Sequence, residues 1–211
     1  MQRPAAGRRM RDLFLAMAEG GHTPASLLLG QDGRVRPHRH YPDGDVYDFA
    51  SHAQFYGHVH RLGELGHIHL FQRPRGMPAG LVPAVPSDEA NAPCHLVAVG
   101  FGPGGDVAEL FTTNRWVTGE AWYEAAAVKA MVARFRITAR DRLAPLAAWL
   151  EAVVAFYRPV IEDLVDERDA AIAEWSRRHP LSDTLNDGAL EITSRRPVDP
   201  VADLAALDRS S

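Results

Sequence analysis

The segment from Gln54 to Phe71, QFYGHVHRLGELGHIHLF, contains two His-x-His pairs on either side of a glycine-containing stretch. Residues i and i+2 of a β-strand point to the same face, so each pair would present both imidazoles on one side of its strand. The stretch from Arg61 to Gly66 suits the loop of a hairpin. The segment therefore predicts a β-hairpin that carries His58, His60, His67 and His69.

The register of this hairpin decides whether the histidines meet. We expect His60 to lie opposite His67, which places His58 opposite His69 on the same face. Directly opposed Cβ atoms are about 4.5 to 5.5 Å apart, so the imidazoles would form a compact group. A shift of one residue would turn His67 and His69 to the other face. The hypothesis of a shared site therefore depends on this register.

Clustered imidazoles repel one another when protonated, which favours the neutral form that binds metals. Imidazole suits a divalent transition metal such as iron, zinc, copper or manganese, and the single cysteine, Cys94, excludes a site built from several thiolates. We therefore predict a metal site formed by His58, His60, His67 and His69. Two other interpretations stay open: a structural or solvated histidine face, and an anion or nucleotide site without metal.

Two residues close to the pairs are candidates for catalytic proton transfer. Glu64 follows the first pair and precedes the second, so it could act as a ligand, as a partner of a ligand or as a general base. Tyr56 shares the expected face of His58 and could also handle protons. We predict an oxidoreductase or a hydrolase that acts on a small molecule at an open coordination position.

The region 36–52, RPHRHYPDGDVYDFASH, is expected to be a long loop dense in polar and aromatic residues. Its Pro42-Asp43-Gly44-Asp45 stretch is typical of a turn. His40 and Asp45 are further candidate ligands next to the hairpin. The alternative for Asp45 is that it only stabilises the turn.

Three stretches of the chain resemble an uncharacterised bacterial family of similar length, a domain of unknown function. They are His40-Tyr41-Pro42-x-Gly44-Asp45-Val46-x-Asp48, Gln54-Phe55-Tyr56-x-His58-x-His60-Arg61 and Gly63-Glu64-x-Gly66-His67-x-His69-x-Phe71, and the resemblance continues through Leu110 to Glu120. The family pattern has histidine where this chain has Leu65, so a histidine there is not essential to this protein. The resemblance supports the site and implies no particular reaction.

Two better-known patterns match only in part. His58-x-His60-x-x-x-Glu64 is similar to the first metal motif of cupins, but the glycines are misplaced and a second motif is missing. His67-x-His69 resembles a fragment of the histidine-triad nucleotide hydrolases, in which Phe71 would have to be a third histidine. Neither pattern assigns a family.

A polar segment, 113–120, follows an expected strand. Arg115 could bind an anionic group of a substrate through its guanidinium, with Asn114 beside it. The alternative is that this segment caps the next helix, with Thr118 as the cap and Glu120 in the first turn. His95, at the start of an expected strand over 95–101, could face the site, although we assign it a structural role.

The chain of 211 residues, 46% of them hydrophobic, is long enough for one sizeable core. We predict an α+β fold with a central antiparallel sheet that includes the histidine hairpin, flanked by helices mainly from the C-terminal half. A single domain would span 1–211. Its parts would be N-terminal helices in 1–30, a sheet and site region in 36–120, a helical region in 121–178, and a short strand and terminal helix in 189–207.

The net charge of −4 and the lack of a basic run argue against a nucleic-acid partner. Apolar runs are too short to span a membrane, and one cysteine is typical of a reducing cytoplasm. A small-molecule ligand is the expected partner, and the helices could form a homodimer contact. The alternative function is a non-catalytic structural or metal-binding module whose helices bind another protein.

Overall fold

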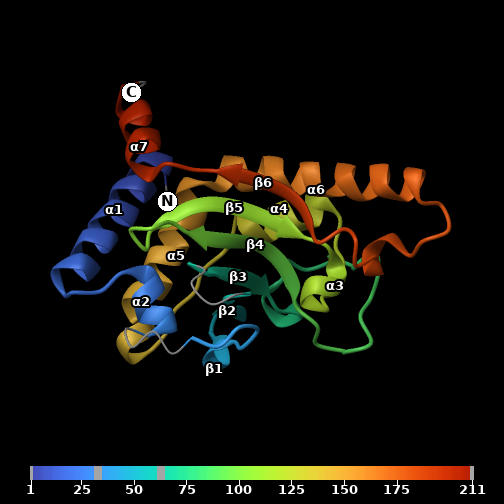
Figure 1. The fold of residues 1–211 in the computed structure, drawn as a ribbon, viewed down its shortest axis with the longest axis horizontal. Helices are drawn as coiled ribbons and strands as arrows, with labels where there is room; N and C mark the ends of the chain where they lie inside the picture. The colour runs from blue at the N-terminus through green and yellow to red at the C-terminus, as the bar shows by residue number, and fades with distance from the viewer. Residues whose placement is uncertain (1, 31–34, 61–64, 210–211) are drawn as a thin grey trace.

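The structure, a computed structural model, describes residues 2–30, 35–60 and 65–209. Six strands form one antiparallel sheet in chain order, and Figure 1 shows them stacked from β1 at the bottom to β6 at the top. The strands are β1 (Tyr41–Tyr47), β2 (Ala53–His58), β3 (His67–Gln72), β4 (Cys94–Phe101), β5 (Val107–Thr113) and β6 (Ile192–Pro197). Each pair of neighbours is antiparallel, so the sheet is a continuous meander.

In the described part of the chain, two α-helices precede the first strand, four lie between β5 and β6, and one follows β6. They are α1 (Arg3–Glu19), α2 (Pro24–Leu29), α3 (Arg115–Thr118), α4 (Ala125–Val132), α5 (Ala144–Phe156), α6 (Arg158–Arg178) and α7 (Pro200–Asp208). Helix α6 lies along the β6 edge of the sheet, with α4 behind the strands (Figure 1). The predicted α+β fold, with helices mainly in the C-terminal half, is confirmed.

The two faces of the sheet differ in chemistry because successive strand residues alternate between them. One face carries aliphatic and aromatic side chains that are fully buried in the hydrophobic core, namely Phe55, Ile68, Leu70, Val97, Val99 and Leu110. On this face Ser194 of β6 donates a hydrogen bond to the carbonyl of Leu164 in α6 at 2.8 Å. The opposite face carries the histidines.

Several helix ends follow from the local sequence. Thr23 caps α2 by accepting a hydrogen bond from the backbone N–H of Ser26, and Asp199 caps α7 in the same way. Pro159 stands in the first turn of α6, where its missing N–H costs no helical hydrogen bond, so α5 ends before it and α6 begins anew.

The region expected to be a loop contains strand β1. Pro42 to Asp45, predicted to form a turn, lie inside this strand as an irregularity where the register with β2 shifts between Tyr41 and Val46. Gly44 and Asp45 have positive φ angles of 81° and 57°, which a regular strand does not accommodate. Turn-forming residues thus form a bulge in an edge strand, where the pairing on one side is absent.

No single helix within the described ranges has both the length and the apolar composition to cross a membrane; α5 and α6 meet both requirements only when taken together, with a bend of 73° between them.

The close approach of α2 to the sheet leads to a test of the fold. A Cβ atom at Gly57 of β2 would lie 2.1 Å from Leu28 Cδ2 and 2.8 Å from the carbonyl oxygen of His67. Because the His67 backbone cannot move without disturbing β3, we expect Gly57→Ala to lower the free energy of unfolding by about 1 to 3 kcal/mol. Gly188, where an added Cβ meets nothing within 4 Å, supplies the control Gly188→Ala. Urea denaturation of both variants measures the difference, and equal stability would contradict it.

Candidate metal centre

The pairing of β2 with β3 differs from the expected register by two residues. His58 lies opposite His67, and Tyr56 lies opposite His69. A shift of two residues leaves every side chain on its original face, whereas a shift of one would not. The expectation of a common face is therefore confirmed for His58, His67 and His69, and the expected pairing of His58 with His69 was wrong. His60 falls just after the end of β2.

The ring nitrogens of the four histidines converge. The Nε2 atom of His58 is 2.8 Å from Nε2 of His67, which is itself 3.1 Å from Nε2 of His69. One ligand atom from each of His58, His67 and His69 lies within 4.8 Å of the others. His60 joins this group at its edge, with its Nε2 atom 3.2 Å from Nε2 of His58.

These contacts suit a cation better than hydrogen bonds. A ring nitrogen offers either one lone pair or one hydrogen in the ring plane. Nε2 of His58 contacts two other ring nitrogens, and Nε2 of His67 also contacts two, so separate linear hydrogen bonds cannot satisfy every contact. In a tetrahedral zinc site with Zn–N distances of about 2.0 to 2.1 Å, neighbouring nitrogens are roughly 3.3 Å apart. The observed spacings are close to that value.

Burial keeps the central imidazoles neutral. His67 is 8% exposed and His69 is 1% exposed. Burial, followed by the neighbouring His58, lowers the pKa of His67 to about 3. Burial and the nearby His95 hold the pKa of His69 well below its ordinary value. Both residues therefore present lone pairs rather than positive charges at neutral pH, as a metal ligand must.

His95 extends the cluster into the protein. Its Nε2 atom is 3.1 Å from Nδ1 of His69, the ring nitrogen that faces away from the cluster. Its own Nδ1 atom is 3.5 Å from the hydroxyl oxygen of Thr113 in β5. Burial, and then the charge of Arg168, lower the pKa of His95 to about 3. A ligating histidine usually has such a partner on its second nitrogen, and the partner fixes the tautomer and the ring orientation.

Glu120 holds His95 in turn. Its fully buried carboxylate accepts a hydrogen bond of 2.6 Å from the backbone N–H of His95 and one of 3.3 Å from the Thr118 hydroxyl. Burial raises the pKa of Glu120 to about 7, against the opposing charge of Arg168. The alternative in which Thr118 caps the next helix and Glu120 lies in its first turn is wrong, because α4 starts only at Ala125.

Tyr56 and His40 cover one side of the cluster. Their rings are stacked with centroids 3.7 Å apart, and the Tyr56 ring lies 5.3 Å from that of His69. Nδ1 of His40 is 3.1 Å from Oδ1 of Asp45. The His40 ring lies 6.0 Å from that of His58. The structure thus places His40 and Asp45 around the cluster, outside the group formed by His58, His67 and His69.

The expected substrate-binding residues make hydrogen bonds within the protein. Asn114 is completely buried, accepts from the backbone N–H of Arg115 and donates to the carbonyl of Thr184. The Arg115 guanidinium donates to the carbonyls of Glu120 and Pro86 and to the side chain of Asn186. A substrate would have to displace these partners, so their binding role stays a prediction. Glu64, the other catalytic candidate, lies outside the described residues.

Most of the chain matches one protein family. The family is described as Domain of unknown function (DUF6969), and the match spans residues 4–198, from the start of α1 to the end of β6. The chain belongs to this family. No curated protein and no solved structure matches the chain. The DUF6969 match therefore leaves the function to be argued from the site.

Two buried residues gained importance only in the structure. His95 was assigned a structural role, yet its ring contacts His69; Glu120 was considered only as part of a helix cap, yet its carboxylate holds the backbone of His95. The sequence feature that could have identified His95 as part of the site is its position at the start of the strand that follows the hairpin. Nothing in the sequence around Glu120 distinguishes a buried carboxylate from a solvated one at a helix terminus.

The lowered pKa values predict how the metal-free protein responds to acid. Unfolding restores the ordinary pKa of 6.5 to His67 and His95, so below pH 6.5 the unfolded chain takes up protons that the folded chain does not. The free energy of unfolding should therefore fall as the pH is lowered from 6.5 toward 3, by up to about 1.4 kcal/mol per pH unit for each histidine.

Urea denaturation between pH 7 and pH 5 measures this slope before most carboxylates titrate. We expect His95→Phe to have a smaller slope, by up to about 1.4 kcal/mol per pH unit at the acid end of this range, because the variant lacks one histidine that is neutral only when folded. The same slope in both proteins would show that His95 does not resist protonation in the fold.

Proposed function

We propose that this DUF6969 protein binds one divalent transition metal through His58, His67 and His69, and that it is a metalloenzyme acting on a small molecule. The convergence of their Nε2 atoms carries the proposal. Three imidazoles from paired strands suit zinc, iron, copper or manganese, of which the structure favours none. Because two of the three histidines are buried, the fold itself determines their positions.

A bound metal would also explain the contact between His69 and His95. When Nε2 of His69 is a ligand, the proton of its ring sits on Nδ1 and can be donated to Nε2 of His95. His95 then carries its own proton on Nδ1, which is directed to the Thr113 hydroxyl. Metal binding would thus fix the tautomers of two buried rings at once, with Glu120 fixing the backbone of the second.

The arrangement of the three histidines favours catalysis. Three protein ligands leave a coordination position for substrate or water, at which a metal supplies Lewis-acid or redox chemistry. Tyr56 packs against His69, and burial, together with the charge of Asp45, raises its pKa above its ordinary value. Tyr56 therefore keeps its proton at neutral pH and could donate it to a reacting group. Glu64 stays a second candidate for proton transfer.

A structural metal site is the second candidate, and one observation favours it. His60 Nε2 lies 3.2 Å from His58 Nε2, close enough to provide a fourth ligand. Four histidine ligands in tetrahedral geometry would close the site, as in structural zinc centres. The two functions differ in whether a small external ligand can reach the metal.

Elemental analysis tests the metal site directly. We expect untagged protein, purified without chelator, to contain close to one equivalent of a transition metal. His58→Ala and His69→Ala should each lose it, because each removes one of only three ligands. The control is His179→Ala, which removes a histidine at the end of α6, away from the sheet. No metal in the wild-type protein, even after incubation with zinc, iron, copper and manganese salts, would overturn the proposal.

Cobalt substitution separates the two candidate functions. The absorption spectrum of the cobalt-loaded protein is recorded with and without azide, and again for His60→Ala. For an enzyme with an open position, azide should change the spectrum of both proteins. For a closed four-histidine site, only the variant should respond, because replacing His60 opens the fourth position.

A further inference from the structure

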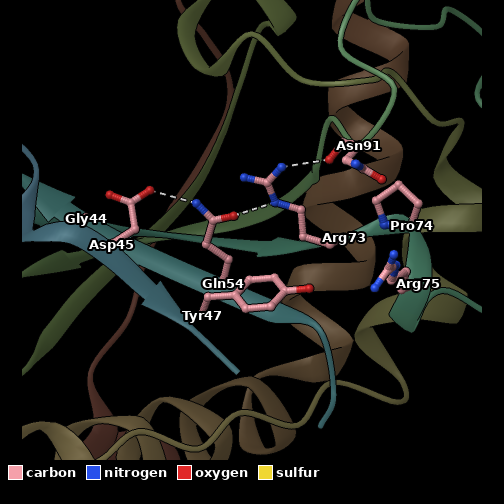
Figure 2. Close-up of a pocket in the computed structure, with 8 residues that line it drawn as sticks. All are labelled: Gly44, Asp45, Tyr47, Gln54, Arg73, Pro74, Arg75 and Asn91. Carbon is pink, nitrogen blue, oxygen red and sulfur yellow. Dashed lines mark hydrogen bonds between the residues drawn. The ribbon is translucent and has the colours of Figure 1, made fainter. Parts of the chain in front are cut away.

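A cavity with a volume of about 490 Å³ lies beside the histidine face, between β1, the start of β2 and the segment that follows β3. Its polar lining consists of Asp45, Tyr47, Gln54, Arg73, Arg75 and Asn91 (Figure 2). Pockets that hold small ligands measure about 300 to 1,000 Å³, so this cavity has a suitable size.

Hydrogen bonds fix one wall of the cavity. Figure 2 shows Gln54 between its two neighbours: its amide nitrogen donates to Asp45 Oδ2 at 2.7 Å, and its oxygen accepts from Arg73 Nε at 2.6 Å. Arg73 also donates from Nη1 to the carbonyl of Asn91 at 2.7 Å. The wall therefore exists before any ligand arrives, and its order lowers the entropic cost of binding.

Two cationic groups of the cavity are available to a ligand. Among the described residues, no hydrogen bond or ion pair engages Arg75, whose side chain is exposed, or Nη2 of Arg73. Asp45, by contrast, uses both carboxylate oxygens, toward His40 and Gln54. A guanidinium binds planar anions through paired N–H groups, so the unused donors indicate a carboxylate.

The charge of the lining also favours a carboxylate over a phosphate. Arg73 and Arg75 face a single acidic residue, Asp45, which leaves one net positive charge. A carboxylate would neutralise this charge, whereas a phosphate monoester carries about 1.5 to 2 negative charges at pH 7 and would leave an excess near Asp45.

The cavity and the metal centre share a wall. Asp45 lines the cavity and contacts His40, whose ring stacks on Tyr56 beside His69. Gln54 lies on the same face of β2 as His58, four residues earlier, which corresponds to roughly 13 Å along a strand. No histidine of the cluster lines the cavity itself, so a ligand that reaches from the arginines to the histidines must pass the His40–Tyr56 stack.

We infer that this cavity binds the carboxylate group of the small molecule that reacts at the metal centre. The part of the inference that concerns the reaction rests on the proposed function, and the part that concerns carboxylate binding rests on the two arginines. Arg75 and Nη2 of Arg73 hold the carboxylate, and the His40–Tyr56 stack separates this end of the substrate from the end that reaches the histidines. The substrate class is therefore an elongated carboxylic acid.

NMR titration of the full-length, metal-free protein tests the inference without any assumption about the reaction. The probes are acetate, succinate, citrate and inorganic phosphate, added at constant ionic strength and pH 7. We expect at least one carboxylate to shift the backbone amide signals of Gly44 and Asn91 in a saturable way. Arg75→Gln should weaken this binding about tenfold or more, because it removes a charged donor from an exposed position. Arg134→Gln, at an exposed arginine beyond α4, is the matched control and should bind as the wild type does.

Each outcome decides one assignment. No saturable shift with any carboxylate, or equal affinity in Arg75→Gln, would overturn the inference. Tighter binding of phosphate than of every carboxylate would overturn the assigned class. Carboxylate binding by a protein that takes up no metal would leave the cavity assignment standing and overturn the proposed function. Arg75→Gln should keep its full metal content, which separates loss of the cavity from loss of the centre.

Discussion

The pairing of β2 with β3 is the interaction on which the site depends. It places His58 opposite His67 and Tyr56 opposite His69, so that all these rings leave the sheet on one side. Strand pairing is periodic in two residues, and a register error of one would bury half of the imidazoles among the aliphatic side chains of the other face. That face forms the hydrophobic core, so the cost of such an error enforces the register.

The core also explains why the histidines remain neutral. Packing one face of the sheet against helices makes the sheet rigid, and the neighbouring strands then exclude water from His67, His69 and His95. Loss of water is the main cause of the lowered pKa of each. Because the folded protein holds these rings neutral, its free energy of unfolding falls in acid. A metal ion bound by the lone pairs would raise that free energy.

The irregular edge strand β1 positions the residues that surround the cluster and line the cavity. The bulge at Gly44 and Asp45 in β1 turns Asp45 toward both His40 and Gln54, which a regular strand would not do. Arg73 follows β3 directly and completes the same wall. One irregular strand thus lies next to both the cavity and the residues that surround the histidine cluster.

The sequence by itself determined the fold class, the hairpin, the common face of the histidines in its strands and the regions of the chain in which the helices lie. These features are local: they depend on a period of two or of about four residues and on capping residues such as Thr23 and Asp199. The expected register was wrong by two residues because periodicity fixes the face of a strand and leaves its offset open.

Only the tertiary structure decided which residues surround the cluster. His95 reaches His69 through the pairing of β4 with β3, and Thr113 and Glu120 reach His95 from β5 and from beyond it. Arg73 and Gln54 meet across nineteen positions of the chain. Contacts between residues far apart in the chain depend on packing and on the exclusion of water, and neither leaves a pattern in a short stretch of sequence.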